Sequence, residues 1–508
     1  MKVTLISPGP SDRYILGVGV RLLSAYLKKN GIDVQIIFLP RSIGEDYTPE
    51  TLDEICNLAD NSDLLGISVM TDDFSNVANI TKRMKLSCTI PIIWGGIHPT
   101  IQPEECLDYA DIVSIGEGEE ALLELVRQIE RSGTFSGIRG LWYKENNKIV
   151  KNELRPLIQD LDAFPFQDYD YEQHYTLRDN SIVKVNEEML AEALDRDYVT
   201  FTSRGCPYKC TYCWNHSFNN MFPGQKILRE RSVNNVIQEL KEIKDKFPFV
   251  KSICVDDDAF FLRAEKRISE FAQEYKKHIG LPFWVTGANP STLSRAKLEI
   301  LVDAGMNRIR MGIQSGSRKT KMLYKRNHTN DQLENAARMI NEYRDKIIMP
   351  SYDLILDNPW ETEEDLIETL RLIARIPAPF TLLVFPLILY PATDLYNKFQ
   401  KENPENQMGL HGQHDFLIYN KPHELKKTYL NKLFLLVNKY STKGKQISPI
   451  AMDLMTNKLY RRIGFSWLVY SLMKFRASFF RIQYLIKEGT RELWKGDVSG
   501  FKKYLKKI

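Results

Sequence analysis

The stretch RGCPYKCTYCWN, residues 204–215, places three of the chain's seven cysteines within eight positions. Their spacing is Cys206-x3-Cys210-x2-Cys213, so all three thiols stand on one short segment. Iron–sulfur cubes are usually held by four cysteine thiolates, and three therefore suit a cube with one iron left open to a substrate or cofactor. A zinc site needs four ligands, and because His216 could supply the fourth, zinc is the alternative.

The composition is that of an ordinary globular protein. The 508 residues are 43% hydrophobic and 26% charged, and a chain of this length predicts roughly three domains. The net charge of +4 is nearly balanced, which argues against a dedicated nucleic-acid binder. No apolar core follows Lys2, so a secretory signal is not expected, and seven cysteines without an even framework indicate a reducing compartment. We therefore expect a cytoplasmic protein.

In residues 1–140, short apolar runs alternate with helical patterns, which predicts a doubly wound, Rossmann-like parallel sheet in an α/β fold. The expected strands are residues 2–7, 34–39, 64–69, 91–96 and 112–116. Such sheets bind ligands beyond the carboxyl ends of their strands. The candidate contacts at those ends are Ser7, Gly9, Ser68, Gly95, Gly96, His98, Gly116, Glu117 and Gly118. Ordinary turns are the alternative, and a lone histidine such as His98 is more often a packing residue.

The chain alternates again around and after the cysteines. Six apolar runs predict strands, at residues 198–202, 252–255, 283–286, 308–313, 351–356 and 381–385. Helical patterns lie between them, which makes six βα units. Parallel barrels carry their active sites at the carboxyl ends of the strands. Here those ends are polar, at residues 256–258, 289, 314–317 and 357–361.

The CxxxCxxC motif after a strand, with Tyr212 inside its last gap, resembles the radical S-adenosylmethionine (SAM) enzymes. The resemblance implies that Cys206, Cys210 and Cys213 hold a [4Fe–4S] cluster whose open iron binds SAM. It also implies a partial (β/α)6 TIM barrel, with which the count of six βα units agrees.

The same resemblance implies where SAM is contacted. In the family the loop after the second barrel strand contacts the amino group or ribose of SAM, which assigns that role to Asp256 and Asp257. Gln314 and Ser315 stand in a segment that resembles the family's GIESGS stretch, with Gln314 in place of the glutamate. Residues 357–363 resemble the family's GxPGET segment, but Asp357 and Trp360 stand where that pattern has glycines.

The first domain resembles the cobalamin-binding domain that precedes many radical SAM barrels. The resemblance rests on Trp94-Gly95-Gly96-Ile97-His98-Pro99-Thr100 and on residues 103–105 and 115–119, and with the barrel it covers about the first 390 residues. It implies that the candidate contacts of the first sheet hold cobalamin. No histidine stands in a DxHxxG pattern, so no histidine is expected to ligate the cobalt. Some members of this subfamily have lost cobalamin.

We expect four regions. They are a cobalamin-binding domain at 1–140, a linker at 141–195, the radical SAM barrel at 196–395 and a helical C-terminal domain at 396–508. In the last region, residues 424–440 and 449–462 read as helices, and a segment from 463 to 486 places basic residues beside aromatic ones. Its uncharged run is too short to span a bilayer. We expect it to pack on the barrel, with contact to a membrane surface or a lipid-like substrate as the alternative.

The implied function is that of an enzyme. A 5′-deoxyadenosyl radical made from SAM would take a hydrogen atom from an unactivated carbon of a small-molecule or lipid-like substrate, and methylcobalamin would deliver a methyl group there. An electron donor such as flavodoxin or ferredoxin is an implied partner, and the catalytic side chains stay unassigned. The alternatives are a radical rearrangement, cyclisation or oxidative ring closure without methyl transfer and, remotely, a sensor without turnover.

Overall fold

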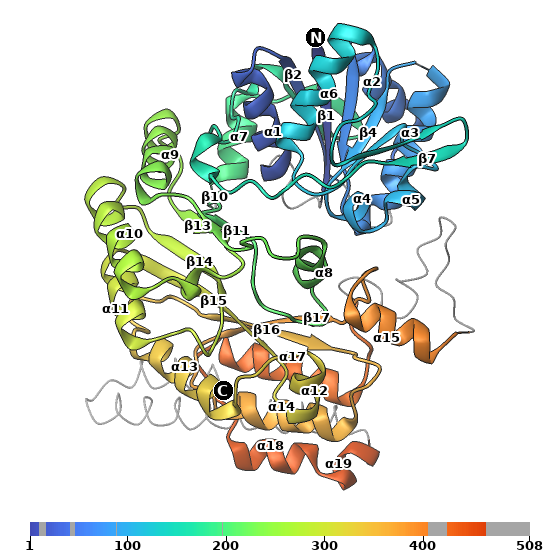
Figure 1. The fold of residues 1–508 in the computed structure, drawn as a ribbon. Coiled ribbons are helices and arrows are strands. Elements are labelled where there is room, and N and C mark those ends of the chain that lie inside the picture. The colour runs from blue at the N-terminus through green and yellow to red at the C-terminus, as the bar shows by residue number, and fades with distance from the viewer. Residues whose placement is uncertain (10–16, 41–45, 88, 196, 405–423, 464–508) are drawn as a thin grey trace, which may run out of the picture.

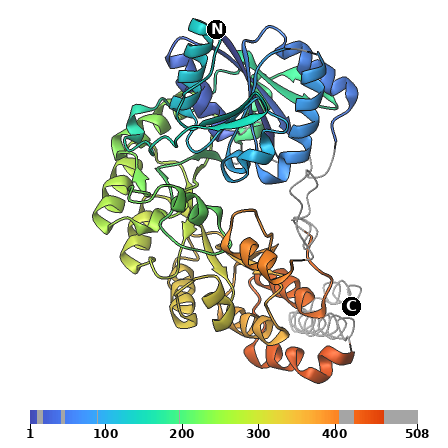
Figure 2. The same ribbon diagram turned by 45° about the vertical axis from the view of Figure 1, so that its right-hand side comes forward.

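The computed structural model describes residues 1–9, 17–40, 46–87, 89–195, 197–404 and 424–463. The N-terminal domain, the barrel and the C-terminal helices follow one another from the top to the bottom of Figure 1. Turned by 45°, the barrel and the C-terminal helices curve beneath the N-terminal domain (Figure 2).

The N-terminal domain is built on a nine-stranded sheet in the order β7-β6-β5-β4-β3-β1-β2-β8-β9. The strands are β1 (Lys2–Gly9), β2 (Asp33–Pro40), β3 (Leu64–Ser68), β4 (Ile92–Gly95), β5 (Ile112–Ser114), β6 (Leu141–Glu145), β7 (Lys148–Lys151), β8 (His174–Arg178) and β9 (Ser181–Lys184). The pairs from β5 to β8 are parallel, while β6, β7 and β9 pair antiparallel at the two ends of the sheet. The chain order reverses between β3 and β1, which is where such sheets bind ligands.

Helices cover both faces of this sheet, as the doubly wound prediction requires. The helices of the domain are α1 (Val18–Lys29), α2 (Pro49–Ala59), η2 (Thr71–Asp73), α3 (Phe74–Ser87), α4 (Ile97–Ile101), α5 (Pro103–Cys106) and α6 (Glu119–Ser132). The apolar side chains of α1 and α6 belong to one core, and those of α2 and α3 belong to the other. The prediction of an α/β domain here is confirmed.

The segment expected as a linker, residues 141–195, instead supplies β6 to β9 and α7 (Glu187–Leu194), with η3 (Leu161–Ala163) and η4 (Tyr171–Gln173) between them. The four strands are short, and two of them, β7 and β9, have no buried residue. β7 and β9 extend the sheet mainly through backbone pairing, which is why their sequence resembles a linker, whereas Leu141 and Tyr143 of β6 and Leu177 of β8 also enter the buried cores.

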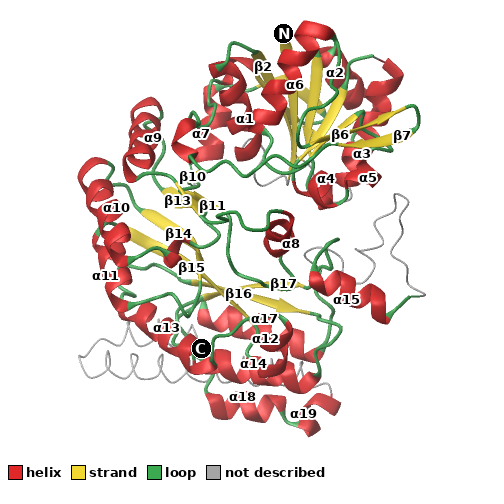
Figure 3. Cartoon of the chain, in the orientation of Figure 1, coloured by secondary structure: helices red, strands yellow, loops and turns green. Residues whose placement is uncertain are grey.

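The barrel is a six-stranded, fully parallel sheet in the chain order β10-β13-β14-β15-β16-β17. Its strands are β10 (Tyr198–Thr200), β13 (Ile253–Val255), β14 (Phe283–Ala288), β15 (Met306–Gln314), β16 (Ser351–Leu356) and β17 (Thr381–Pro386). Its helices are α8 (Trp214–Met221), α9 (Val233–Lys246), η5 (Phe260–Leu262), α10 (Glu265–His278), α11 (Arg295–Asp303), α12 (Arg318–Leu323), α13 (Asn330–Glu342) and α14 (Glu363–Arg375). Figure 3 shows α9, α10, α11 and α13 along the outside of this sheet. A small antiparallel ribbon, β11 (Ser203–Arg204) with β12 (Arg229–Glu230), stands between β10 and α9 in the chain.

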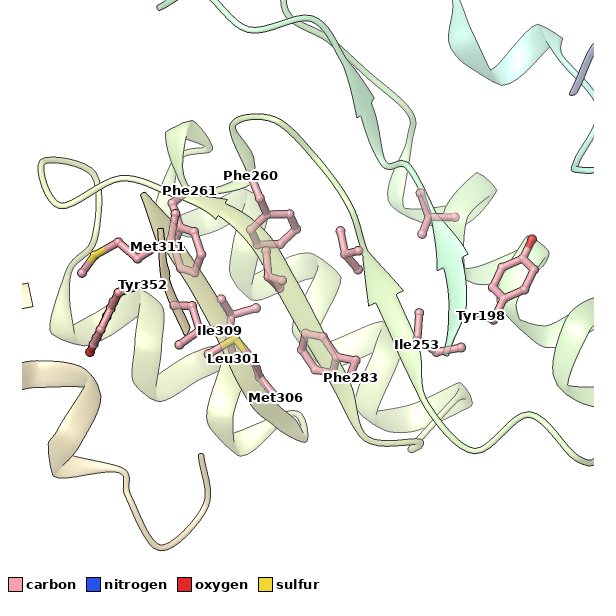
Figure 4. Close-up of a cluster of buried hydrophobic side chains, with 14 of the residues drawn as sticks. Tyr198, Ile253, Phe260, Phe261, Phe283, Leu301, Met306, Ile309, Met311 and Tyr352 are labelled. Atoms are coloured by element: carbon pink, nitrogen blue, oxygen red, sulfur yellow. The ribbon is translucent and has the colours of Figure 1, made fainter. Parts of the chain in front are cut away.

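Large apolar side chains fill the space between the barrel strands and their helices (Figure 4). Phe260, Phe261 and Phe283 are at most 1% exposed, and so are Met311 and Tyr352. Each fully buried side chain of this size contributes about 1.5–3 kcal/mol relative to an exposed one. The carboxyl ends of the strands are thereby fixed on a packed base.

The C-terminal helices α15 (Asp394–Glu402), α17 (Tyr429–Ser441), α18 (Pro449–Thr456) and α19 (Lys458–Ile463) follow the barrel. Helix α17 covers the outer edge of β17, where the Asn438 side chain accepts a hydrogen bond from the backbone N–H of Leu382 at 2.8 Å. In the part of the chain that the structure describes, every helix is too short or too polar to cross a membrane. Residues 464–486 lie outside the described residues, so their contact with the barrel or with a membrane surface stays a prediction.

Asp357 ties the C-terminal region to the barrel. It follows β16 with a φ of 56°, and its carboxylate accepts hydrogen bonds at 2.8 Å from the backbone N–H of Lys426 and from the Asn431 side chain. This explains one departure from the family's glycine pattern, because aspartate tolerates a left-handed backbone better than most residues and supplies two acceptors.

Replacing Asp357 by glycine keeps the backbone unstrained and removes both acceptors. We expect the free energy of local opening of α17 to fall by about 1–3 kcal/mol, the cost of leaving these donors unpaired. Hydrogen exchange of residues 424–441 checks this. Asp357→Asn, which keeps one acceptor oxygen, should give an intermediate rate, and an unchanged rate in the glycine variant would contradict the role of Asp357.

Candidate functional site

The three cysteines of the motif lie on the loop that joins β11 to α8. Cys206 and Cys210 are buried, Cys213 is half-buried, and all three are free thiols. Burial raises the pKa of Cys206 to about 11 and that of Cys213 to about 12. Without a metal these thiols are therefore protonated near neutral pH, and ligation releases their protons.

The backbone of this loop is held on both sides of Cys206. Gly205 has a φ of 88°, and a Cβ there would lie 2.3 Å from the carbonyl oxygen of Ile227, so the position requires glycine. The Asn219 side chain donates a 2.7 Å hydrogen bond to the carbonyl of Cys206, and the N–H of Cys213 donates to the carbonyl of Cys210 at 3.0 Å. The loop is thus fixed by its own backbone as well as by any ligand.

Asp257 anchors the start of the loop from inside the barrel. Its carboxylate is 1% exposed and accepts hydrogen bonds from the N–H of Thr202 (2.7 Å), the Thr202 hydroxyl (2.5 Å), the N–H of Ser203 (3.1 Å) and Arg263 Nη1 (2.9 Å). These partners satisfy both of its oxygens. Because the carboxylate faces protein groups, this placement argues against the predicted contact of the Asp257 side chain with SAM.

The two flanking acids are more open. Asp256 is half-buried and accepts a 2.8 Å hydrogen bond from the Thr286 hydroxyl. Asp258 is exposed beside the cysteine loop and interacts with Asn215. Desolvation by the protein around its carboxyl group raises the pKa of Asp258, and the charges of Asp257 and Asp256 raise it further. Asp256 therefore keeps its predicted role, and Asp258 joins it as a candidate contact.

Arg326 was not expected as a site residue. Its guanidinium Nη1 lies 3.9 Å from the Cys210 Sγ, and Nη2 donates a 2.5 Å hydrogen bond to the carbonyl of Gly312. Its Nε is buried without a hydrogen-bond partner among the described residues. Tyr212, the aromatic of the motif, packs edge-on against Tyr324 with ring centroids 4.9 Å apart. A cation and an aromatic ring thus flank the thiols.

In the segment that resembles GIESGS, Gln314 lines a cavity whereas Ser315 is buried in the protein. Gln314 adopts a φ of 65° and lines a cavity, so it keeps its predicted role as a cofactor contact. Ser315 is 1% exposed, and its hydroxyl bonds with Glu361, Thr369 and the N–H of Ser317. This placement argues against a cofactor contact by the Ser315 side chain, which holds the loop together.

A cavity of about 280 Å³ opens at the carboxyl ends of β15, β16 and β17. Its lining comprises Tyr212, Arg310, Gln314, Asp353, Ile355, Phe385, Pro386, Leu387, Ile388 and Tyr390. Arg310 Nε lies 2.9 and 3.0 Å from the two oxygens of Asp353, which makes an ion pair inside the barrel. Neither residue was predicted, although a charge in the middle of a strand that is otherwise apolar was the available signal.

Glu361 lies beside the loop that contains Ser315. Its Oε1 accepts hydrogen bonds from Ser315 (3.3 Å) and Thr320 (3.1 Å), and its Oε2 is buried without a hydrogen-bond partner in the described residues. Burial raises the pKa of Glu361 to about 7. The carboxyl group is therefore partly protonated at neutral pH.

In the N-terminal domain, the small residues that were predicted as cofactor contacts lie where the carboxyl ends of the sheet's strands meet. We call this side of the sheet the glycine edge. Gly9 ends β1 with open space where a Cβ would stand, and Ser7 and Ser68 lie near the ends of β1 and β3. Gly95 ends β4, and Gly96 has a φ of 106° with a hypothetical Cβ 3.0 Å from the carbonyl oxygen of Val69. On the same edge Met70 is 47% exposed, an apolar surface that a bound ligand would cover.

The other predicted contacts of this domain behave differently. His98 is 3% exposed, with its ring 4.7 Å from that of Phe74 and its Nε2 3.6 Å from Glu105. Its burial inside the domain favours a packing role over the predicted cofactor contact. Gly116 and Gly118 lie at the sheet edge, but the Glu117 carboxylate between them turns to the barrel, where Arg204 and Arg229 bind it. This placement argues against the predicted contact of the Glu117 side chain with cobalamin.

The residues present in the two domains fit the cofactors that the resemblance implies, an iron–sulfur cluster and cobalamin. Three free thiols with a guanidinium beside them suit a cluster of three thiolates, because the cation offsets part of their charge. His216 directs Nε2 to Asp394, at 3.5 Å. Within the described ranges, no group of three or more His, Cys, Asp or Glu side chains is arranged to hold a metal ion as it stands. The glycine edge and the exposed Met70 suit a large flat ligand such as cobalamin.

Replacing Asp257 by asparagine removes the buried anion beside Arg263, which then keeps only Glu230, at 3.1 Å, as a carboxylate partner. We expect a loss of about 3–5 kcal/mol in the free energy of unfolding of the barrel and a lower iron content, since the loop before Cys206 loses its anchor. Iron content per chain after anaerobic reconstitution checks this. Asp256→Asn is the control, and equal iron content in the two variants would contradict the anchoring role.

Glu361→Gln tests the pH dependence of stability. Because the pKa of Glu361 in the folded chain is raised from 4.5 to about 7, its ionisation destabilises the fold progressively as pH rises through this range. We expect the unfolding midpoint of the variant to exceed that of the wild type by about 2–4 °C at pH 8 and by less at pH 5. Glu363→Gln, at an exposed glutamate, should show no such trend, and an equal difference at both pH values for Glu361→Gln would refute the assignment.

Comparison with known proteins agrees with this geometry. Residues 13–126 match the family model of the B12 binding domain, and residues 200–373 match that of the radical SAM superfamily. An uncharacterized methyltransferase of Pyrococcus horikoshii is 28% identical over 78% of this chain and 82% of its own length. The anaerobic magnesium-protoporphyrin IX monomethyl ester cyclase of Cereibacter sphaeroides is 25% identical over 55% of this chain and 44% of its own.

Among solved structures, the chain resembles the radical SAM methyltransferase TsrM of Kitasatospora setae, with cobalamin and a [4Fe–4S] cluster bound. The TM-score is 0.62 at 17% identity, over 79% of this chain and 75% of TsrM, which shows a shared fold. The two family models together span more than half of the chain. With the cysteine loop and the glycine edge in their places, the chain belongs to the cobalamin-dependent radical SAM enzymes, whose cofactors are a [4Fe–4S] cluster, SAM and cobalamin.

Proposed function

We propose that this enzyme methylates a carbon atom of a small molecule bound in the cavity at the carboxyl ends of β15, β16 and β17. One observation carries the proposal. Tyr212 from the cysteine loop and Tyr390 both line the cavity, and the Tyr390 hydroxyl donates a 3.2 Å hydrogen bond to Asp72, which follows β3 in the B12-binding domain. A molecule in this cavity therefore lies between the cysteine loop, the proposed site of the cluster and SAM, and the sheet edge that is the proposed site of cobalamin.

Together the cofactors supply a 5′-deoxyadenosyl radical, which removes a hydrogen atom, and a methyl group for the carbon left behind. Cys206, Cys210 and Cys213 hold the cluster, and Asp256, Asp258, Gln314 and Arg326 are the proposed contacts of SAM. The sheet edge with Ser7, Gly9, Ser68, Gly95, Gly96, Gly116 and Gly118 is the proposed site of cobalamin. A one-electron donor such as flavodoxin or ferredoxin completes the system.

The lining of the cavity supports a substrate with an apolar body and one polar group. Ile355, Phe385, Leu387 and Ile388 form an apolar wall, which also excludes water from a reactive carbon. The Arg310–Asp353 pair is the polar anchor, since Arg310 is 33% and Asp353 16% exposed and both keep donors or acceptors toward the cavity.

The names of the relatives support methyl transfer first and ring closure second. The relative from Pyrococcus horikoshii and TsrM are both called methyltransferases, whereas the relative from Cereibacter sphaeroides is called a cyclase. An oxidative ring closure is therefore the second candidate. It would use the same cavity and would leave the methyl group of SAM out of the product.

The experiment uses holoenzyme reconstituted anaerobically with a reductant, methyl-labelled SAM and a low-molecular-weight extract of cells that make the protein. We expect both 5′-deoxyadenosine and a labelled product. In Cys210→Ala, which lacks one cluster ligand, we expect 5′-deoxyadenosine to fall at least about a hundredfold and iron content to fall with it. Cys254→Ala, a buried cysteine of β13, is the matched control.

Two results would overturn parts of the proposal. If 5′-deoxyadenosine forms and a product appears without label, the enzyme rearranges or closes a ring and does not methylate. If Cys210→Ala keeps the iron content and the 5′-deoxyadenosine yield of the intact enzyme, the cysteine loop does not hold the cluster.

A further inference from the structure

The ribbon β11–β12 carries two arginines directly opposite each other. In its antiparallel register Arg204 faces Arg229, and like charges in that position repel. Arg229 is 2% exposed and the Arg204 side chain 24%, so water screens this repulsion poorly. The ribbon therefore needs an anion from elsewhere.

Glu117 of the N-terminal domain supplies that anion. Arg229 Nη1 lies 2.8 Å from both oxygens of Glu117, and Arg204 Nη1 lies 3.3 Å from Oε1. The N–H of Ile158 donates to Oε2 at 2.9 Å, and Glu119 binds Arg204 Nη2 at 2.5 Å. Burial alone would raise the pKa of Glu117, but the arginines outweigh it and the pKa is lowered. The carboxylate is thus ionised and held by two domains.

On the barrel side, the ion pair of Glu117 with the two arginines connects to the loop that carries the three cysteines. Arg204 precedes Cys206 by two residues, and the residue between them, Gly205, is backed against the carbonyl of Ile227. Arg229 Nε in turn donates to that carbonyl at 3.2 Å. A displacement of the ribbon therefore moves the first cysteine with it. Figure 1 shows β11 and α8 between the barrel sheet and the N-terminal domain.

On the side of the N-terminal domain, the same ion pair connects to the edge of the sheet where the carboxyl ends of its strands lie. Glu117 directly follows Gly116, which has a φ of 89° and whose N–H donates to the Thr100 hydroxyl at 3.1 Å. A Cβ on Gly116 would lie 3.4 Å from the ring of Phe222, just after α8. The backbone beside Glu117 thus has little room to shift between the two domains.

We infer that Glu117 is a positioning residue that fixes the edge proposed for cobalamin at a set distance from the cluster loop. This inference rests on the proposed function, because a methyl group can reach a substrate radical only when both cofactor edges face one cavity. The hydrogen bond from Tyr390 to Asp72 is a second attachment on the far side of that cavity. With Glu117 released, the Arg204–Glu119 pair and the Tyr390–Asp72 hydrogen bond remain, but the carboxylate that holds both arginines is lost and the spacing of the two edges is less tightly fixed.

The test compares Glu117→Gln with Glu120→Gln in the full-length holoenzyme. Glu120 stands in the first turn of α6, three residues after Glu117, and pairs with Arg155 rather than with the barrel ribbon, so it controls for the loss of one charge. The first measurement is the magnetic dipolar coupling between cob(II)alamin and the reduced cluster by pulsed paramagnetic resonance. We expect one narrow distance distribution in the wild type and in Glu120→Gln, and a broadened one in Glu117→Gln.

The second measurement is the ratio of labelled product to 5′-deoxyadenosine. A misplacement of about 1 Å can reduce a rate about a hundredfold, so we expect this ratio to fall at least about tenfold in Glu117→Gln. Glu117→Asp, which keeps the charge but retracts it by one methylene, should give an intermediate ratio, and it replaces Glu117→Gln if the latter does not fold. A role in folding alone would lower both products together and leave the ratio unchanged.

An unchanged distance distribution in Glu117→Gln would overturn the inference, and so would a broadened distribution with an unchanged ratio. If the wild type forms no labelled product, the proposed methyl transfer fails, and the distance measurement alone then decides whether Glu117 holds the two domains in place.

Discussion

The structure of the site depends on a buried carboxylate. Asp257 has no access to water and accepts four hydrogen bonds, three of them from Thr202 and Ser203 at the start of the cysteine loop. A buried charge is tolerated only when its partners are fixed around it. Because Arg263 balances Asp257 and also pairs with Glu230 of β12 at 3.1 Å, the anchor extends into the ribbon that Glu117 holds from the other domain. The cysteines are thereby positioned before any metal binds.

The elements that sequence predicted best are those determined by local pattern. Apolar β-branched runs predicted the strands of both sheets, and cysteine spacing predicted the loop of the cluster, because each signal lies within a few residues. The polar residues at strand ends were harder to assign. Ser315 and Asp257 were expected at SAM, and His98 and Glu117 at cobalamin, whereas each is bound by protein groups distant in the sequence: Thr202 lies 55 residues before Asp257, and Arg229 lies 112 residues after Glu117. A carboxylate at the end of a strand can face a ligand or a neighbouring loop, and only the fold decides which.

Two features of the structure, the strands β6 to β9 and the Arg310–Asp353 pair, were not predicted for a different reason. The strands β6 to β9 looked like a linker because all four are short and because β7 and β9, which end the sheet, bury no residue. Arg310 and Asp353 escaped notice because a charge inside a strand normally argues against burial, yet the lumen of a partial barrel is a surface on which such a pair can lie. Period-two alternation along β15 and β16 places both on that side, so the pattern held the information once the barrel was known.

The departures from the family's pattern carry information of their own. Asp357 and Trp360 stand where glycines are expected, and both bind the C-terminal region: Asp357 holds Lys426 and Asn431, and the Trp360 indole donates to Glu402 of α15 at 2.6 Å. A glycine could make neither contact. Glu361, with its raised pKa, follows directly and reaches the Ser315 loop. The C-terminal helices are therefore tied to the loop that borders the cavity, at two of the positions where this chain differs from its family's pattern.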